Sequence, residues 1–423
     1  MTTPVTLGQI FSRLFGPDAP ARFSAYDGSM AGDPTARIGL HVATPRGTSY
    51  IATAPGSLGL ARAYVQGDLE IDGAHPGDPY DVLKLVEDDL HLRKPSPLEV
   101  ATWVRALGPR TLLPPEPPAN EVRPLRWIPR HHKMRDARAI SHHYDVSNRF
   151  YEMVLGPSMT YTCACYPTED ATLEEAQEHK YDLVARKLGL RPGMRLLDVG
   201  CGWGGMVRHA ARHYGVRVLG VTLSREQASW AQERIKLDGL DDLAEVRHLD
   251  YRDVTEGDFD AISAIGLIEH IGPENYPVYF RFLRSRLRPG GRFLSHGITR
   301  PDNKHPGLPQ RGFIGRYVFP DGGLTGSGDT VAAMEDAGFE VQHSENLRVH
   351  YARTLQQWCR NLVDNWDDCV AEAGLATARV WGLYMAGSRL AFERNGIQLH
   401  QVLATRTGDD GDADYPLRHD FGV

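Results

Sequence analysis

The hydrophobic and polar positions divide the chain into two unlike stretches. In the first, apolar residues recur at helical spacing over Thr6–Phe15, and a second helix is expected over Pro79–Asp88. Two short apolar runs, Ile38–Val42 and Tyr50–Ala54, predict strands. This mixture predicts a small α+β domain over residues 1–110.

In the second stretch, short apolar runs alternate with helical patterns. The predicted strands are Arg195–Val199, Arg217–Val221, Glu245–Leu249, Phe259–Ile265 and Gly291–Gly297. The predicted helices include Leu173–Leu188, Arg225–Asp238 and Tyr276–Leu287. Alternating strands and helices are typical of a parallel sheet with crossover helices. Residues 141–405 are therefore predicted to form a doubly wound α/β domain of the nucleotide-binding kind.

Two further segments complete the predicted organisation. The run Pro114–Pro118 cannot continue a helix or lie inside a sheet, so residues 111–140 are interpreted as a stiff linker followed by a basic segment. Residues 406–423 are acidic and rich in glycine, and we expect this tail to be loosely ordered.

Composition excludes several classes of protein. Of the 423 residues, 41% are hydrophobic and 24% are charged, which excludes a disordered or fibrous chain. The five cysteines form no CxxC pair, so neither a disulfide framework nor a structural zinc site is expected, and a reducing cytoplasm is favoured. No run of 18 apolar residues occurs, and the first residues do not form a secretory signal pattern. We therefore expect a chain that does not span a membrane.

One segment departs from the acidic average of the chain. The net charge of −7 argues against a nucleic-acid partner. Between Glu121 and His143, however, there are six basic residues and two acidic ones, which gives a net charge of +4. The apolar pair Trp127–Ile128 lies among them. This segment is either a solvated connecting face or a surface that meets anionic lipid headgroups.

A glycine-rich turn follows the first predicted strand of the α/β domain. Residues Asp198–Gly205 read Asp-Val-Gly-Cys-Gly-Trp-Gly-Gly, and such glycines let a ligand approach the backbone closely. The spacing differs from that of a dinucleotide site, and the next strand ends at Gly220–Ser224 without the acidic residue that would hold a ribose. The lysine of a P-loop is absent as well. We interpret the turn as a site for a nucleoside that carries an amino acid.

Together with four other motifs, this turn resembles the cyclopropane-fatty-acyl-phospholipid synthase and mycolic acid methyltransferase family. The other motifs are His143–Ser147, Tyr161–Ala164, Gly220–Gln227 and Ile268–Gly272. They stand in the family's order between about Ile140 and Phe392. The resemblance implies a class I methyltransferase sheet with helical additions at an acyl site, preceded by a lipid-binding-like domain.

The resemblance also implies S-adenosylmethionine as the methyl donor. The positions that match its contacts are Tyr161 and Thr162 at the methionine end, Gly200, Cys201 and Gly202 beneath it, Thr222, Leu223 and Gln227 at the ribose and adenine, and Tyr251 and Arg252 over the adenine. A simpler interpretation is that Thr222 and Gln227 only cap the helix that follows. Asp198 ends a predicted strand, where its carboxylate is a candidate to orient the amino group of the cofactor.

For catalysis, the resemblance implies a bound bicarbonate ion as general base. Its expected contacts are Cys163, Glu269, His296, the backbone of Ile298, and Tyr351. In the sequence, Glu269 lies at an apolar strand end, His296 follows a strand and Tyr351 precedes a helix. Polar groups at the carboxyl edge of a parallel sheet commonly bind ligands. Cys163 taken alone is more often a small buried apolar residue, and no metal site is expected.

The implied reaction adds a methyl-derived carbon across the cis double bond of an unsaturated acyl chain in a phospholipid. Loss of one proton would close a cyclopropane ring, whereas loss of another would leave a methylene branch that a flavin-type reductase would convert to a 10-methyl branch. Resemblance to actinobacterial relatives favours the branched product. Expected partners are the anionic inner face of the membrane, which the chain would meet peripherally from the cytoplasm, such a reductase, and a second copy in a homodimer. Two alternatives stay open: a methyltransferase of a soluble lipid-like or natural-product acceptor, and a membrane-docking lipid-binding protein with a vestigial cofactor site.

Overall fold

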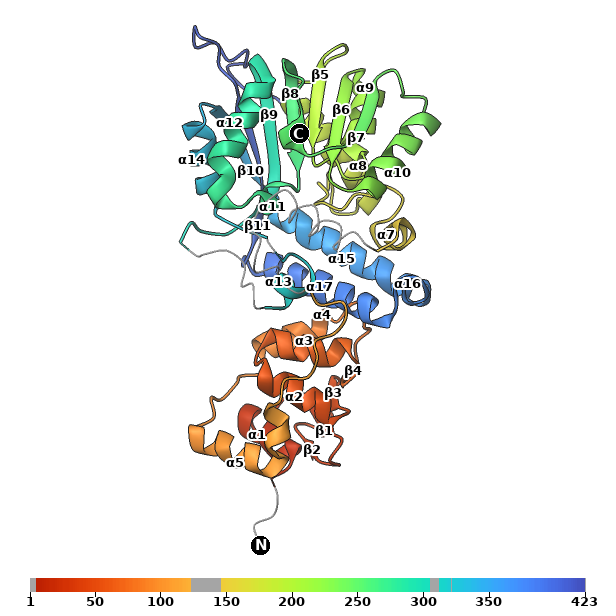
Figure 1. Ribbon diagram of the computed structural model, residues 1–423, viewed down its shortest axis with the longest axis vertical. Coiled ribbons are helices and arrows are strands. Elements are labelled where there is room, and N and C mark those ends of the chain that lie inside the picture. The colour runs from red at the N-terminus through yellow and green to blue at the C-terminus, as the bar shows by residue number, and fades with distance from the viewer. Residues whose placement is uncertain (1–4, 123–145, 305–311, 321, 423) are drawn as a thin grey trace. The chain divides into compact units, whose positions relative to one another are not determined.

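The computed structural model describes residues 5–122, 146–304, 312–320 and 322–422, and it divides into two compact units (Figure 1). The N-terminal unit comprises Met1–Arg123, Pro309–Pro320 and Trp358–Leu390. The sheet unit comprises Pro124–Leu308, Asp321–Gln357 and Ala391–Val423. Beyond its first two residues, the basic segment from Glu121 to His143 lies outside the described residues, as do His143, Tyr144 and Asp145 of the first family motif.

The N-terminal unit contains a small sheet with the strand order β2-β1-β3-β4. Its strands are β1 (Arg22–Ala25), β2 (Met30–Ala31), β3 (Gly39–Val42) and β4 (Leu69–Asp72). Its helical segments are α1 (Leu7–Phe15), α2 (Pro45–Thr53), α3 (Ser57–Val65), α4 (Tyr80–Asp88), α5 (Pro97–Leu107), η1 (Pro109–Leu112), α13 (Phe313–Tyr317) and α16 (Trp366–Ala373). Buried aromatic side chains, among them Phe11, Phe23 and Tyr50, form the core of this unit.

The strand predicted at Tyr50–Ala54 is wrong, because most of these residues lie in helix α2. The helix begins after Thr44, whose side chain accepts a hydrogen bond from the N–H of Gly47, and Pro45 occupies its first turn. The ring of Tyr50 is buried on the inner face of this helix. An apolar run of five residues fits one turn of a buried helix as well as a short strand.

The sheet unit is built on seven strands in the order β10-β11-β9-β8-β5-β6-β7. They are β5 (Arg195–Val199), β6 (Arg217–Thr222), β7 (Ala244–His248), β8 (Phe259–Ile265), β9 (Leu287–Thr299), β10 (Glu340–Asn346) and β11 (Gln398–Thr405). Strands β5 to β9 pair in parallel, whereas β11 pairs antiparallel with both β9 and β10. The doubly wound fold and its five predicted strands are confirmed.

Helices cover both faces of this sheet (Figure 1). The helices of the sheet unit are α7 (Asn148–Leu155), α8 (Leu173–Leu188), α9 (Gly205–Tyr214), α10 (Arg225–Leu237), α11 (Ile268–Ile271), α12 (Tyr276–Arg286) and α14 (Ser327–Asp336), with the single turns η2 (Tyr251–Asp253) and η3 (Pro273–Asn275). Two more helices, α15 (Arg348–Asp364) and α17 (Leu375–Glu393), have residues in both units.

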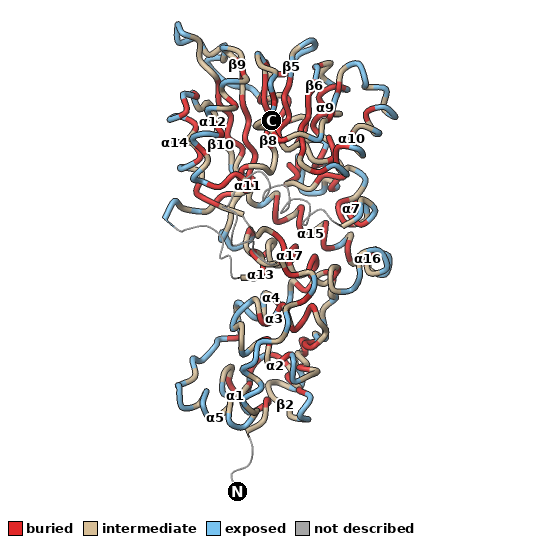
Figure 2. The backbone as a smooth tube through the Cα atoms, viewed as in Figure 1, coloured by how far each residue is buried: buried red, intermediate tan, exposed pale blue. Residues whose placement is uncertain are grey.

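Apolar packing on both faces explains why the central strands are mostly apolar. Leu196 and Leu197 belong to different buried clusters, because successive side chains of a strand point to opposite faces. Figure 2 shows buried residues running along the strands. Such a sheet exposes polar groups mainly at its strand ends, and the glycine-rich turn and Thr222 lie at two of these ends.

The acidic tail forms no helix or strand over its described residues, 406–422. It nevertheless contacts the sheet unit, since the guanidinium of Arg186 donates to the carbonyl of Phe421 and that of Arg292 lies 4.8 Å from the ring of Tyr415. Within the described part of the chain, no helix combines the length and apolar character needed to cross a membrane.

Candidate active site

The glycine-rich turn connects β5 to α9 and leaves open space above its backbone. Gly200, Gly202 and Gly204 have φ angles of +73°, +54° and +76°, a region that favours glycine. The N–H groups of Gly200 and Cys201 both donate to the carbonyl of Val221, over 2.9 and 3.0 Å, which ties the turn to β6. A Cβ atom on Gly202 would meet no atom within 4 Å. The turn therefore has room for a ligand that lies against its backbone.

The residues predicted at the ribose and adenine gather at the end of β6. The hydroxyl of Thr222 donates to Oε1 of Gln227 over 2.8 Å, and the carbonyl of Leu223 lies 3.1 Å from Nε2 of His248. The cap of α10 is Ser224, whose side chain accepts from the N–H of Gln227. Ser224 and not Thr222 is therefore the N-cap, although the hydroxyl of Thr222 accepts from the N–H of Ser224 over 3.3 Å at the start of this helix.

Tyr251 and Arg252 form the single turn η2, which follows β7. Arg252 forms two hydrogen bonds with the carboxylate of Asp250, of 2.8 and 2.6 Å, a fork geometry that fixes the guanidinium. The ring of Tyr251 lies edge-on to that of Tyr279, with 5.4 Å between centroids. Both side chains are thus held by neighbours in the sheet unit.

A buried lysine that was not among the predicted site residues, Lys180, holds the segment predicted at the methionine end. Nζ of Lys180 donates to Oγ1 of Thr162 over 2.9 Å and to Oε1 of Gln177 over 2.8 Å. Nearby, the buried carboxyl of Asp198 accepts from the hydroxyl of Ser263 over 2.6 Å. Burial lowers the pKa of Lys180 to about 7 and raises the pKa of Asp198 to about 6.

The sequence pattern of α8 indicates that Lys180 is buried. Gln177, Lys180 and Lys187 recur at spacings of three and seven on α8, and they share its buried face with Val184. Polar residues on the apolar stripe of a helix indicate buried partners, because an unpaired buried charge is costly. Opposite them, a Cβ on Gly266 would come within 2.8 Å of Cγ2 of Thr162, so the Tyr161–Thr162 segment packs on the end of β8.

Glu269 presents one satisfied and one unsatisfied oxygen. The backbone N–H of Ile298 donates to Oε1 over 2.7 Å. Oε2 is buried and has no hydrogen-bond partner among the described residues. A Cβ on Gly297 would lie 3.5 Å from Oε2, so the carboxyl group lies against the backbone of β9. Burial raises the pKa of Glu269 to about 7, because it penalises the charged form.

His296 is fully buried inside β9 rather than after a strand, because β9 continues to Thr299. Its Nδ1 lies 3.1 Å from Nε2 of Gln401. Its Nε2 is buried, and no residue that the structure describes provides a partner for it. Burial holds the pKa of His296 well below its usual value, so the ring is neutral.

Cys163 and Tyr351 meet at one backbone carbonyl, that of Leu347. Sγ of Cys163 lies 3.9 Å from this oxygen and 3.2 Å from the carbonyl of Ala164. The N–H of Tyr351 donates to the same Leu347 oxygen over 3.2 Å. Tyr351 lies in the first turn of α15 rather than before a helix, and burial raises the pKa of Cys163 well above its usual value, so Cys163 is a thiol.

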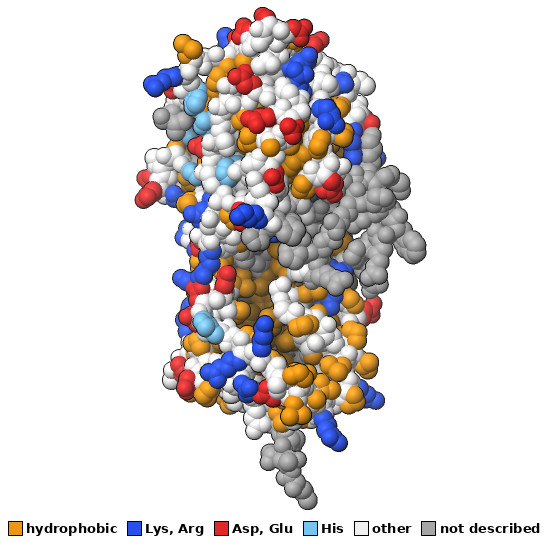
Figure 3. All heavy atoms as spheres, turned by 90° about the vertical axis from the view of Figure 1, so that its left-hand side faces the viewer, with side chains coloured by type: hydrophobic (Ala, Val, Ile, Leu, Met, Phe, Trp, Pro, Cys, Tyr) orange, Lys and Arg blue, Asp and Glu red, His pale blue; other side chains and the backbone are white. Residues whose placement is uncertain are grey.

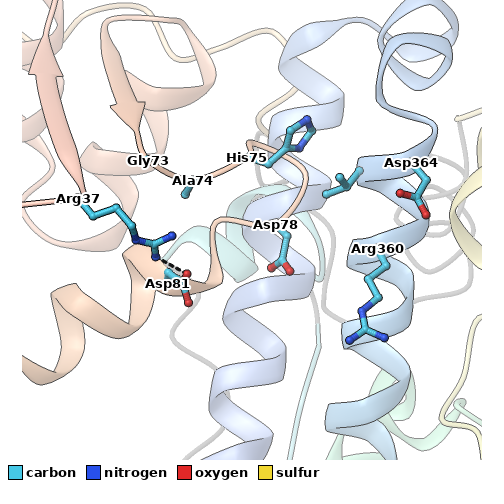
Figure 4. A pocket seen from close by; sticks show the side chains of 9 residues that line it. Arg37, Gly73, Ala74, His75, Asp78, Asp81, Arg360 and Asp364 are labelled. Carbon is cyan, nitrogen blue, oxygen red and sulfur yellow. Dashed lines mark hydrogen bonds and ion pairs between the residues drawn. The ribbon is translucent and has the colours of Figure 1, made fainter. Parts of the chain in front are cut away.

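A separate pocket of about 430 Å³ lies in the N-terminal unit (Figure 4). Its lining includes both positive and negative side chains. Arg37 pairs with Asp81, and Arg360 and Asp364 come from α15. Asp78 lies between these two groups (Figure 4). Its remaining lining residues are Gly73, Ala74, His75 and Val363. None of the predicted site residues lines this pocket, so it takes no part in the site described above.

Comparisons of the sequence and of the structure with known proteins agree on one family. Residues 131–402 match the family model of mycolic acid cyclopropane synthetase. The chain is 60% identical over 404 residues to a probable fatty acid methyltransferase of Mycobacterium tuberculosis, covering 94% of each chain. It is 37% identical over 269 residues to the cyclopropane-fatty-acyl-phospholipid synthase of Escherichia coli K12, covering 64% of this chain and 68% of that one. A solved mycolic acid cyclopropane synthase in complex with SAH and CTAB is 34% identical, with a TM-score of 0.59, over 63% of this chain and 97% of that one.

Proposed function

Since the chain belongs to the mycolic acid cyclopropane synthetase family and is an S-adenosylmethionine-dependent methyltransferase that acts on fatty acids or lipids, we propose a specific reaction for it. It transfers a methyl-derived carbon to the cis double bond of an unsaturated acyl chain in a phospholipid, with bicarbonate as the general base. The observation that carries this proposal is a pair of buried polar atoms without described partners, Oε2 of Glu269 and Nε2 of His296. His296 lies in β9, where it pairs with Ile265, the last residue of β8, and Glu269 lies in α11, which follows that strand.

The glycine-rich turn fits S-adenosylmethionine, because the space above Gly202 is open and a hydroxyl–amide pair, Thr222 and Gln227, lies at the end of the next strand. These residues would hold the nucleoside, and Asp198 and Thr162 would hold the methionine end. When bound, the cofactor supplies an electrophilic methyl group. An alkene is a weak nucleophile, so the protein must hold the two reactants close together and keep water out.

The buried acid and the neutral imidazole each fit a contact with a small oxyanion. Oε2 of Glu269 would accept its O–H, and the neutral ring of His296 would donate to one of its oxygens. The N–H of Ile298 already donates to Oε1 of Glu269, so its part in the site is to hold that carboxyl. Cys163 and Tyr351 complete the proposed contacts. When bound, bicarbonate supplies a base that is not attached to the chain, so no side chain needs to face the sulfonium as a free base.

We also propose that the chain meets the anionic inner face of the membrane peripherally. The N-terminal unit exposes large apolar side chains on α5 and around η1, namely Leu98, Val100, Leu112 and Leu113. Figure 3 shows hydrophobic side chains gathered on one face of this unit. Exposed apolar side chains combined with the +4 charge of the segment from Glu121 to His143 are typical of proteins that bind anionic bilayers.

The product we favour is the methylene-branched chain, which a flavin-type reductase would convert to a 10-methyl branch. Two relatives that match over nearly their whole length are named probable fatty acid methyltransferases, which supports methyl transfer to an acyl chain. The preference for the branched product rests on the resemblance to actinobacterial relatives. A homodimer stays part of the proposal.

Fatty-acid mass spectrometry of a host that expresses the chain tests the proposal. We expect new acyl chains that are one CH₂ heavier, and they should disappear in Glu269→Gln, which retains cofactor binding. Hydrogenation followed by fragmentation separates the methylene branch from the cyclopropane of equal mass. Co-expression of a reductase should then add two hydrogens to the branched product. Unmodified phospholipid combined with turnover of a soluble acceptor would contradict the proposal.

A further inference from the structure

A row of polar side chains crosses the antiparallel edge of the sheet unit. The strand register places Glu345 of β10 opposite Gln401 of β11, and Gln401 opposite His296 of β9. Lys187 reaches this row from α8: its Nζ donates to Oε1 of Gln401 over 2.6 Å and to the carboxylate of Glu345. Gln401, His296 and Lys187 are almost completely buried, and only Glu345 reaches solvent.

The ammonium group of Lys187 determines which atom donates and which accepts in each hydrogen bond between Lys187, Gln401 and His296. A lysine ammonium group only donates, so Oε1 of Gln401 must accept from Lys187. The amide therefore turns its NH₂ group toward His296, whose Nδ1 lies 3.1 Å away and must accept. A neutral imidazole that accepts at Nδ1 carries its proton on Nε2.

We propose that Gln401 and Lys187 are positioning residues that hold His296 in the tautomer with its proton on Nε2, so that it donates a hydrogen bond to an oxyanion in the active site. The proposal rests on the proposed function, in which His296 helps to hold the base. With the proton on Nδ1, the buried Nε2 would present a lone pair to that oxyanion and repel it. Second-layer partners commonly select the tautomer of a functional histidine in this way.

The identity of residue 401 separates this role from a purely structural one. Glu345 already supplies a carboxylate that balances the buried charge of Lys187. If residue 401 served only to balance that charge, a carboxylate would suit this position better than an amide. An amide at position 401 can accept from Lys187 and donate to His296 at the same time. The positive charges of Lys180 and Lys187 also oppose a second proton on His296, which keeps the ring neutral.

The tautomer can be read directly, without any activity. In protein labelled with ¹⁵N in its histidine rings, two-bond ¹H–¹⁵N correlation spectra distinguish a protonated Nε2 from a protonated Nδ1. The signals of His296 are identified by their loss in His296→Gln. We expect a single neutral form with the proton on Nε2 from pH 6 to pH 9. A proton on Nδ1, or an imidazolium in this range, would overturn the proposal.

The effect on the reaction is tested with Gln401→Met, which keeps the volume and removes the amide. We expect kcat for lipid methylation to fall about 10- to 100-fold, while the Kd of S-adenosylmethionine stays within about twofold. Gln398→Met, on the same strand, is the matched control and should retain the wild-type kcat. An unchanged kcat in a folded Gln401→Met protein would overturn the positioning role.

A second variant covers the case in which Gln401→Met does not fold. Lys187→Gln replaces a donor-only group by one that also accepts, so the NMR spectrum should show both tautomers and kcat should fall. A spectrum that keeps the wild-type tautomer in this variant would contradict the role of Lys187. If wild-type protein methylates no lipid, the proposed function fails, while the NMR result still decides whether the row sets the tautomer.

Discussion

The backbone N–H of Ile298 donates to Oε1 of Glu269 over 2.7 Å, while Oε2 of the same carboxyl group has no partner among the described residues. Strand β9 thus holds one oxygen of a buried acid and leaves the other available to a ligand. A buried polar atom without a partner costs free energy, so it is expected to persist where function uses it. This asymmetry makes Glu269 the most informative residue for experiments.

The free energy of unfolding of the ligand-free protein should depend on pH through the carboxyl group of Glu269. Burial raises its pKa from 4.5 to about 7, so the folded chain holds this proton more tightly than the unfolded chain. Stability is therefore lost as the pH rises from about 4.5 through about 7. Glu269→Gln keeps the acceptor for Ile298 and removes the titration. We expect the variant to gain on wild type between pH 5 and pH 8, by at most about 3 kcal/mol.

Thermal unfolding at several pH values in bicarbonate-free buffer measures this gain. Glu226→Gln, at an exposed position on the first turn of α10, is the control and should show no gain over wild type between pH 5 and pH 8. A difference for Glu269→Gln that does not change with pH would show that the carboxyl group does not titrate in this range.

Gly202→Ala should weaken cofactor binding more than it weakens the fold. Its Cβ would project into open space above the turn, where the cofactor is proposed to lie, at a φ of +54°. Gly239→Ala is the matched control, because Gly239 has a φ of +66°, also lacks neighbours within 4 Å and lies in an exposed turn. Both variants should lose about 1 kcal/mol of unfolding free energy.

Calorimetry distinguishes the two glycines. We expect the Kd of S-adenosylmethionine to rise at least about tenfold in Gly202→Ala, which corresponds to about 1.4 kcal/mol, and to stay at the wild-type value in Gly239→Ala. Equal affinities in the two variants would place the cofactor away from this turn.

Lys180→Met should also weaken cofactor binding, although Lys180 is not proposed to touch the cofactor. Its Nζ holds Oγ1 of Thr162 over 2.9 Å, and a hydrogen bond from a partly charged donor contributes about 1 to 3 kcal/mol. We expect calorimetry to show a Kd for S-adenosylmethionine raised by about tenfold or more. Lys236→Met, at an exposed position of α10, is the control. A Kd within twofold of wild type would mean that Thr162 keeps its position without the lysine.

Membrane binding should depend on the basic segment. Replacing Arg123, Arg126, Arg130 and Lys133 with Gln removes four positive charges, each of which contributes about 1 kcal/mol near an anionic surface. We expect weaker co-sedimentation with vesicles that contain anionic lipid, and loss of the salt dependence of that binding. Vesicles of neutral phosphatidylcholine serve as the control. Unchanged binding would make this segment a solvated linker.

Local patterns by themselves determined much of the fold. Strands β5 and β8 and helix α8 have the predicted bounds, because the apolar runs, the glycine turn and the capping residues that define them lie within a few residues of each other. The glycine-rich turn was also readable, since its backbone geometry demands glycine. The failure at Tyr50–Ala54 has the same origin, because a short apolar run carries no period that separates a helix from a strand.

Only the tertiary structure decided how the predicted side chains are held. Gln401 lies 105 residues from His296 in the sequence, and their hydrogen bond exists because β11 pairs with β9 in one particular register. Strand β11 was not predicted, so nothing in the sequence pointed to this pair. Likewise, the free oxygen of Glu269 and the partners of Lys180 follow from burial. Burial is a property of the packed sheet and its helices, whereas residue type and spacing are properties of the chain.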